Sequence, residues 1–327
     1  MPALRTPQKR YNNDVIFSHL SEYCTCSHKL KSKTVIIIAG PTAVGKTSLA
    51  IEIAKHFNTQ IISADSRQCF RELTIGVAKP SAEQLQQVKH YFINSHSIHD
   101  EVNAAAFEQY ALRSLQEIFS HHDVALIVGG TGLYIRALCE GLDEIPPVAP
   151  VIRENIIADY NRSGLTWLQE QVRINDPEYF LTGEIANPQR LMRALEVKVG
   201  TGKSIRQFQQ KKKIARDFSI IKVGLQLPKD QLHENIHYRV NEMMKQGLLQ
   251  EVESQLPYKS LPALRTVGYT ELFSYLEGKM SLEEAIELIK KNTRHYAKRQ
   301  LTWFKKDKSI TWYTPFNKQE IIDLYQV

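Results

Sequence analysis

The sequence predicts an α/β fold: a P-loop NTPase-like parallel sheet core, flanked by helices and interrupted by a helical insertion. Short apolar runs alternate with amphipathic stretches, the pattern of a parallel sheet covered by helices; the runs are TVIIIA from Thr34, QIISA from Gln60 and VALIV from Val124. A glycine-rich phosphate-binding motif follows the first run directly. About 70 residues of helical periodicity without strand character follow the turn-rich segment DEIPPVAP.

These patterns divide the 327 residues into three parts. Residues 1–32 are polar and aperiodic, so they are expected to form a poorly ordered extension. Residues 33–142 and 217–327 form the predicted catalytic core with its C-terminal helices. Residues 143–216 form the predicted helical insertion.

The first strand runs into GPTAVGKT, which fits the pattern G-x-x-x-x-G-K-[ST]. Glycines let backbone N–H groups curl around an anion, the lysine Lys46 adds a positive charge, and the hydroxyl of Thr47 can bind Mg²⁺. A helix from about Leu49 to Phe57 should follow. The motif predicts a phosphate or diphosphate site, made by Gly40, Pro41, Thr42, Ala43, Val44, Gly45, Lys46 and Thr47.

The second strand, QIISA, ends at Asp65, which we expect to share a crevice with Lys46 because strand carboxyl ends line the site of an open α/β sheet. The third strand, VALIV, follows a predicted helix from Ala105 to Phe119 and runs into GGTG without the carboxylate that a Walker-B motif would place there. Machinery for nucleotide hydrolysis therefore looks incomplete. We interpret Asp65 as a catalytic carboxylate, and a helix N-cap is the alternative.

The insertion ends in the basic run KKKIAR from Lys211, for which a solvated linker and an RNA contact remain equally open. Strand character returns in SIIKVGLQL from Ser219, and Pro228 then opens a helix. The last long helix is expected from about Leu282 to Lys306. Its spacing places four side chains on one face and predicts that two large aromatics pack inward. The four are Thr293, Tyr296, Arg299 and Gln300, and the two are Trp303 and Phe304.

Composition narrows the class of protein. The longest uninterrupted apolar stretch, Val35 to Ala39, is far short of the roughly 20 residues that span a bilayer, and no signal-like segment precedes it. The four cysteines (Cys24, Cys26, Cys69 and Cys139) contain a single C-x-C pair, too few for a structural metal site. We therefore expect a soluble, cytoplasmic protein with reduced thiols.

The net charge of +7 is unevenly distributed along the chain. Residues 1–150 carry 14 Lys+Arg and 14 Asp+Glu, while residues 151–327 carry 28 and 21. The second half therefore holds the whole excess, which favours a polyanionic partner such as nucleic acid, although many basic faces are only solvated surface.

Six blocks in order resemble one family, the tRNA dimethylallyltransferases (tRNA isopentenylpyrophosphate transferases). The blocks are GPTAVGKT at Gly40, DSRQCFRELTIGVAKP from Asp65, VGGTGLYIRALCEGLD from Val128, NPQRLMRALEV from Asn187, RTVGY from Arg265 and TRHYAKRQLTWFKK from Thr293. The resemblance implies transfer of a dimethylallyl group from dimethylallyl diphosphate to N6 of the adenosine 3′ of the anticodon, in tRNAs that read codons beginning with U. The products would be N6-(dimethylallyl)adenosine and diphosphate. It also implies Mg²⁺ as cofactor, the tRNA anticodon stem-loop as partner and a monomeric enzyme.

The resemblance assigns roles to individual residues. Asp65 would take the N6 proton, Lys46 and Thr47 with Mg²⁺ would neutralise the leaving diphosphate, and Arg239 would reach that diphosphate. The implied tRNA-binding residues are Asp65, Ser66, Arg67, Gln68, Thr131, Arg153, Gln189, Arg190, Leu191, Met192, Arg193, Arg265, Thr266, Val267, Gly268, Tyr269 and Thr270.

Three alternatives share parts of this pattern. A small-molecule P-loop kinase would also use the loop and Asp65, but it does not explain the basic second half. An adenylate prenyltransferase would act on free nucleotide and leave the basic insertion without a purpose. A non-catalytic RNA-binding module would keep the loop only as a turn.

Overall fold

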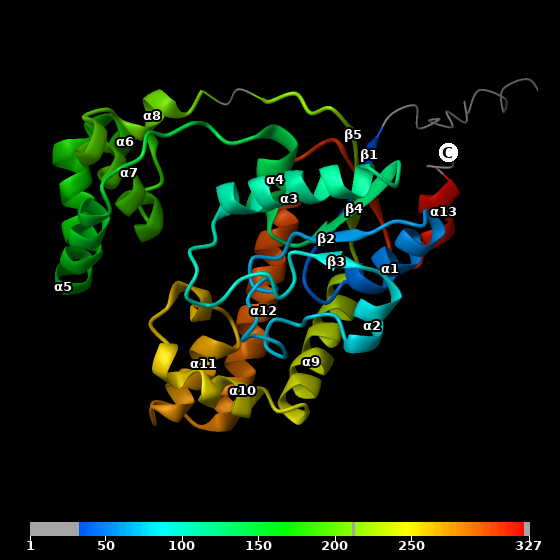
Figure 1. Ribbon diagram of the computed structural model, residues 1–327. Coiled ribbons are helices and arrows are strands. Elements are labelled where there is room, and N and C mark those ends of the chain that lie inside the picture. The colour runs from blue at the N-terminus through cyan, green and yellow to red at the C-terminus, as the bar shows by residue number, and fades with distance from the viewer. Residues whose placement is uncertain (1–32, 211–212, 324–327) are drawn as a thin grey trace, which may run out of the picture.

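The computed structural model describes residues 33–210 and 213–323. The predicted N-terminal extension, with Cys24 and Cys26, and the first two lysines of KKKIAR lie outside the described residues. The described part forms a sheet core with a group of helices set apart from it (Figure 1).

The core is one six-stranded sheet with the order β3-β2-β4-β1-β5-β6, and each neighbouring pair is parallel. The strands are β1 Thr34–Ala39, β2 Ile61–Ser63, β3 His90–Tyr91, β4 Val124–Gly129, β5 Ser219–Leu225 and β6 Ile310–Tyr313. Four of them coincide with the predicted strands, which confirms the predicted parallel α/β core. The two edge strands, β3 and β6, were not predicted.

Strand β1 is buried on both faces, which explains its continuous run of aliphatic residues. Val35 and Ile37 point into one hydrophobic cluster, and Ile36 and Ile38 point into another. Helices α3 (Ala104–Phe119) and α4 (Gly132–Glu140) pack in the first cluster. Helices α1 (Lys46–His56) and α13 (Lys318–Asp323) pack in the second, while α2 (Ala82–Gln87) contributes no buried residue.

A second group of helices extends from the sheet past the ends of the strands (Figure 1). Helices α9 (Lys229–Lys245) and α12 (Leu282–Phe304) contact each other, and α12 also contacts α11 (Tyr269–Leu276). Helix α10 (Leu248–Ser254) and two 3₁₀ turns, Leu256–Tyr258 and Pro262–Leu264, complete this group. These helices carry RTVGY and the basic C-terminal segment to the side of the sheet where the P-loop lies.

The helices between β4 and β5 have a hydrophobic cluster of their own, which includes Leu168, Val172 and Leu195. They are α5 Pro150–Asn175, with a non-helical break at Gly164, α6 Pro177–Thr182, α7 Pro188–Thr201 and α8 Ile205–Phe208. Figure 1 shows them in green, beside the core, joined to it by two connecting segments. The returning segment is anchored by Arg216, which pairs with Glu108 and donates to the carbonyl of Leu138 at 2.7 Å.

Within the described ranges, no helix is both long and apolar enough to cross a membrane. Cys69 and Cys139 are free thiols.

Candidate active site

The P-loop connects β1 to α1 through a backbone that only small residues permit. Gly40 and Gly45 have positive φ angles of 154° and 98°, and a Cβ on Gly40 would lie 2.8 Å from the carbonyl oxygen of Leu225. Helix α1 has no acidic residue in its first turn. Its N-terminus therefore presents unpaired N–H groups and the positive end of the helix dipole to an anion.

Lys46 lies folded against its own loop. Its Nζ donates to the carbonyl oxygens of Pro41 at 2.7 Å and Gly40 at 3.0 Å. Burial, and secondarily the positive charge of Arg239, lower the pKa of Lys46 to about 7, while the negative charge of Asp65 opposes the shift. A bound diphosphate would place negative charge beside this amine and favour its protonated form.

Helix α9 contacts the same loop through two residues one helical turn apart. Asn235 donates to the carbonyl oxygen of Ala43 at 3.2 Å, and Arg239 Nη1 donates to Thr42 Oγ1 at 3.4 Å. Ala43 has a positive φ of 64°, so its strained conformation is held by this contact. Burial lowers the pKa of Arg239 from its usual value. The structure thus brings Arg239 to the P-loop, and Asn235 is a contact that the sequence did not indicate.

Asp65 lies two residues after the end of β2 and lines the cavity that Lys46 also lines. Its Oδ1 accepts hydrogen bonds from the backbone N–H groups of Arg67 at 2.9 Å and Gln68 at 3.3 Å. Among the described residues, none donates a hydrogen bond to Oδ2. The helix N-cap alternative is therefore wrong, because the residues that Asp65 caps form a turn and not a helix, and the turn uses only one carboxylate oxygen.

Hydrogen bonds that involve Thr131, Ser63 and Ala78 fix the residues after Asp65. Ser66 N–H donates to Thr131 Oγ1 at 3.1 Å. Gln68 accepts from Ser63 Oγ at 3.0 Å and donates to the carbonyl oxygen of Ala78 at 3.0 Å. Because both ends of its amide are occupied, Gln68 shapes the site by closing the loop up to Ala78.

Gln300 is also a site residue. The sequence predicted the helix face on which it lies but not the groups that it contacts. It is 6% exposed, its Oε1 accepts from the N–H of Thr42 at 2.9 Å, and its Nε2 donates to the carbonyl oxygen of Gly130 at 2.9 Å. A Cβ on Gly130 would lie 2.1 Å from this Nε2, so the glycine is required for the contact. Helix α12 is thereby attached both to the P-loop and to the loop after β4.

Two cavities meet at these residues. The first, about 550 Å³, contains the P-loop residues Thr42 to Ser48 apart from Val44. The second, about 350 Å³, lies between Ser66, Arg67 and the segment 265–268. Both are lined by Thr42, Asp65, Val77, Ala78, Arg239, Met243 and Tyr296. A molecule in the first cavity can therefore meet a group from the second beside Asp65.

Tyr296 of α12 lies at this junction. Burial, with a smaller contribution from the Asp65 charge, raises the pKa of Tyr296 to about 12, so its hydroxyl keeps its proton near neutral pH.

Comparison with known proteins agrees with this geometry. The sequence profile of the IPP transferases matches residues 68–307. The chain belongs to the IPP transferase family. A tRNA dimethylallyltransferase of Christiangramia forsetii is 49% identical over 282 residues, covering 86% of this chain and 93% of that one. One from Bacteroides thetaiotaomicron is 42% identical over 290 residues, covering 89% and 94%.

Solved structures show the same family likeness. The full-length tRNA isopentenylpyrophosphate transferase of Bacillus halodurans is 32% identical, with a TM-score of 0.65, and the alignment covers 88% of this chain and 94% of that chain. A eukaryotic dimethylallyltransferase acting on tRNA is 25% identical, with a TM-score of 0.74, covering 89% and 78%.

In this family member, the segment 265–270 divides between cavity and core. Arg265, Thr266, Val267 and Gly268 line the second cavity. Tyr269 is fully buried, so its side chain is not available to RNA in this arrangement. Thr270 is exposed and donates to the carbonyl oxygen of Thr266 at 3.1 Å.

The site residues expected in the insertion lie on α7, except for Arg153 on α5, and line neither of the two cavities. Leu191 and Met192 are 0% and 7% exposed and belong to the hydrophobic cluster of the insertion, so these two side chains face away from solvent. Gln189 and Arg190 are exposed. Arg193 and Arg153 both pair with the buried Glu196, at 2.6 and 3.1 Å.

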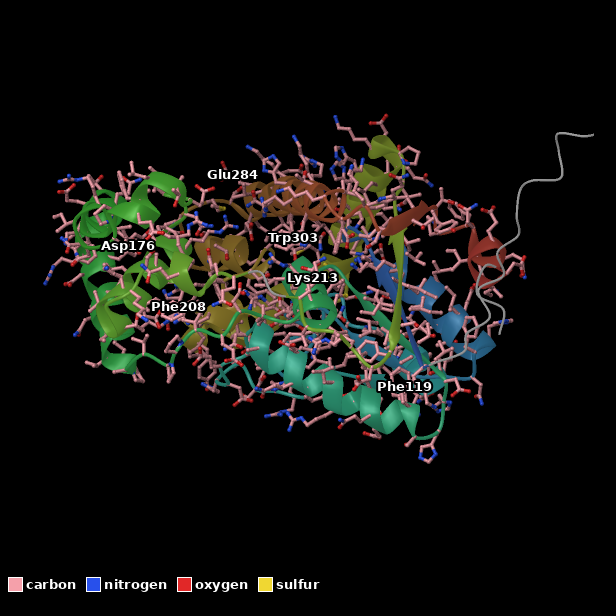
Figure 2. All side chains as sticks on the ribbon, turned by 90° about the horizontal axis from the view of Figure 1, so that it is seen from above. Phe119, Asp176, Phe208, Lys213, Glu284 and Trp303 are labelled. Carbon is pink, nitrogen blue, oxygen red and sulfur yellow. The ribbon has the colours of Figure 1, made fainter. Side chains whose placement is uncertain are left out.

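The two aromatic residues near the end of α12 differ in burial. The prediction for Phe304 is confirmed and that for Trp303 is wrong. Phe304 is buried, whereas Trp303 is 38% exposed. Trp303 packs directly on Gly132 at the start of α4, where a Cβ would be 2.1 Å from its Nε1. Figure 2 shows Trp303 and Lys213 in the middle of the molecule, and both line a third cavity. Lys213 pairs with Glu140 at 2.8 Å.

Proposed function

We propose that this protein transfers the dimethylallyl group of dimethylallyl diphosphate to N6 of an adenosine in tRNA. Family membership and the activity named for relatives such as that of Christiangramia forsetii support this transferase activity. The observation that carries the proposal is the meeting of two cavities at Asp65. Cationic groups lie on the P-loop side, and the segment 265–268 lines the second cavity.

The first cavity suits the donor. P-loop N–H groups, Lys46 and Arg239 would bind the diphosphate and stabilise the negative charge that develops as the C1–O bond breaks. Apolar side chains at the junction, Val77 and Met243, would contact the five-carbon group. The diphosphate of the donor would thus lie at the P-loop and its five-carbon group at the junction of the two cavities.

The residues present fit Mg²⁺ bound mainly through the substrate. The described ranges contain no group of three or more His, Cys, Asp or Glu residues that could hold a metal. Thr47 lines the donor cavity, and Mg²⁺ commonly takes few protein ligands together with substrate phosphate oxygens. We propose that the hydroxyl of Thr47 and the diphosphate oxygens hold it, where it would neutralise leaving-group charge.

Asp65 would act on the acceptor. The N6 lone pair attacks C1 of the dimethylallyl group, the C1–O bond breaks, diphosphate leaves, and the N6 proton passes to the carboxylate of Asp65. Its Oδ2 is suited to that step because Oδ1 is already bonded to the turn.

The second cavity suits the acceptor base. An adenine stacked in an anticodon loop must leave the stack before its amine can reach C1. Arg265, Thr266, Ser66 and Arg67 border the cavity that such a base would enter, and Thr131 fixes the backbone of Ser66.

More distant contacts would come from the insertion, through Gln189, Arg190, Arg193 and Arg153. We propose the adenosine 3′ of the anticodon in tRNAs that read codons beginning with U as the acceptor. The enzyme would act as a monomer in the cytoplasm, where tRNA is found.

The deciding assay supplies labelled dimethylallyl diphosphate and Mg²⁺ with unmodified tRNA, AMP or ATP. Label in tRNA alone is the expected result. Label in AMP or ATP would favour an adenylate prenyltransferase, and no label in any acceptor would contradict the proposed reaction. A parallel incubation with γ-labelled ATP tests for the kinase alternative.

A further inference from the structure

The loop 74–80 and the segment 265–268 are separate walls of the two cavities. In the loop, Thr74, Ile75 and Lys79 line the first cavity, Gly76 lines the second, and Val77 and Ala78 line both. The segment 265–268 lines only the second. Correct spacing between donor and acceptor therefore requires that these two walls keep a fixed relation.

Glu251 of α10 contacts the loop 74–80 and Tyr269. Its Oε2 accepts from the N–H groups of Ile75 at 2.8 Å and Thr74 at 3.1 Å, and its Oε1 accepts from the N–H of Gly76 at 3.0 Å. Three successive N–H groups around one carboxylate form an anion-binding nest. The hydroxyl of Tyr269, which directly follows the segment 265–268, donates to the same Oε1.

Close packing reinforces these hydrogen bonds. A Cβ on Gly76 would lie 2.5 Å from the ring of Tyr269 and 2.9 Å from Leu248, so the loop backbone lies directly on the ring. Burial, and then the Glu251 charge, raise the pKa of Tyr269, which keeps its hydroxyl a donor. The loop and the tyrosine therefore cannot shift independently.

We propose that Glu251 is a positioning residue that couples the loop 74–80, which lines both cavities, to the segment 265–268 of the acceptor cavity. Glu251 lines neither cavity, so it acts through the loop and through Tyr269. Hydrogen bonds to a charged acceptor are roughly twice as strong as neutral ones, and three of the four bonds go to backbone that no other described side chain caps. The kinetic consequences rest on the proposed function, whereas the coupling itself does not.

The first test compares Glu251→Gln with Glu253→Gln, an exposed glutamate two residues further along α10. Glutamine keeps the size but replaces one acceptor oxygen by a donor, which faces an N–H group. Glu251→Gln should raise KM for both dimethylallyl diphosphate and tRNA by about tenfold, and Glu253→Gln should leave both within about twofold. If KM for both substrates is unchanged and kcat falls only with the folded fraction, Glu251 is merely structural and the proposal fails.

Tyr269→Phe removes the hydrogen bond between Tyr269 and Glu251 and leaves the bonds from Glu251 to the loop 74–76. Tyr238→Phe, on the exposed face of α9, is the control. Loss of the hydroxyl should raise KM for tRNA more than KM for the donor, because the nest on the loop remains. The double variant should be no worse than Glu251→Gln alone, since the two residues act as one unit. Additive effects would show that they act separately and would overturn the coupling.

Hydrogen exchange tests the coupling without any transfer activity. In Glu251→Gln, amides in both 74–76 and 265–270 should exchange at least about tenfold faster than in the wild type. Faster exchange in 74–76 alone would refute the coupling. If the wild type modified no tRNA, the proposed function would fail while this measurement would still decide the role of Glu251.

Discussion

The P-loop side of the sheet and the helical insertion are assembled in opposite ways. On the P-loop side, Gln300 contacts Thr42 from 258 positions away, and Arg239 contacts it from 197 positions away. In the insertion, Glu196 takes Arg193 from three positions away and Arg153 from 43. Figure 1 shows the same contrast, because the green helices pack on one another while the P-loop side gathers segments from both ends of the chain.

This difference matches the two proposed tasks, catalysis on the P-loop side and tRNA binding by the insertion. Groups that must meet at one atom are drawn from distant elements and fixed by several bonds each. The RNA contacts proposed for the insertion require only a stable scaffold with exposed cations. Variants on the P-loop side should therefore change the rate of transfer, and variants in the insertion should change tRNA affinity.

The largest effect is expected for Asp65→Asn. Asparagine keeps an oxygen for the N–H groups of Arg67 and Gln68, so the turn should survive while the base is lost. Single-turnover transfer at saturating tRNA should fall by about 10² to 10⁴-fold, with tRNA affinity retained in filter binding. A variant that keeps its rate would remove Asp65 from the mechanism. One that loses tRNA binding in proportion to rate would make it a recognition residue.

Lys46→Ala should have the next largest effect. It removes a charge-assisted contact to the diphosphate worth about 1.5 to 3 kcal/mol, or roughly 10 to 100-fold. The loss should appear in binding of the donor, measured calorimetrically, and in the transfer rate, but not in tRNA affinity. Unchanged donor binding would count against the P-loop as the donor site.

Donor binding should also depend on pH through Lys46. The pKa of this amine is about 7 without ligand and should rise when diphosphate binds, so above pH 7 binding takes up a proton. Affinity for inorganic diphosphate with Mg²⁺ should fall by up to about tenfold per pH unit above 7. Calorimetry in buffers of different ionisation enthalpy measures the uptake, and Lys46→Ala, as control, should lose it.

The same shift has a defined sign for stability. Between pH 7 and 10.5 the unfolded chain holds the lysine proton more tightly than the folded protein does. The contribution of Lys46 to the free energy of unfolding should therefore increase with pH in that window. Chemical denaturation of wild type and Lys46→Ala at several pH values tests this sign, and a wild-type stability that falls relative to the variant would contradict it.

The smallest effect is expected in the insertion. Arg190→Ala should weaken tRNA binding by about 3 to 10-fold and reduce the slope of log affinity against log salt by about one, with transfer at saturating tRNA unchanged. Arg162→Ala, an exposed arginine paired with Asp159, provides the control. For the wild type, salt should weaken tRNA binding steeply and donor binding less. A reduced transfer rate in Arg190→Ala would show that the insertion also takes part in chemistry.

The sequence by itself determined the parts of this protein that depend on neighbours along the chain. The P-loop, four strands and the position of Asp65 at a strand end follow from local spacing, because phosphate binding and strand burial are encoded within a few residues. The two edge strands, of two and four residues, each contain a single buried residue, and a pattern with one buried position cannot be distinguished from a turn. Pairing with β2 and β5 stabilises β3 and β6, although their own sequence patterns do not predict strands.

Only the tertiary structure decided which distant groups meet. Helical periodicity placed Gln300 on a face, yet the face does not say that Thr42 and Gly130 lie opposite it. Periodicity also predicted a buried Trp303, but that side chain packs on Gly132 and stays partly exposed. The physical reason is the same in both cases: apolar spacing records that a side chain faces protein, whereas its partner depends on how separate elements pack.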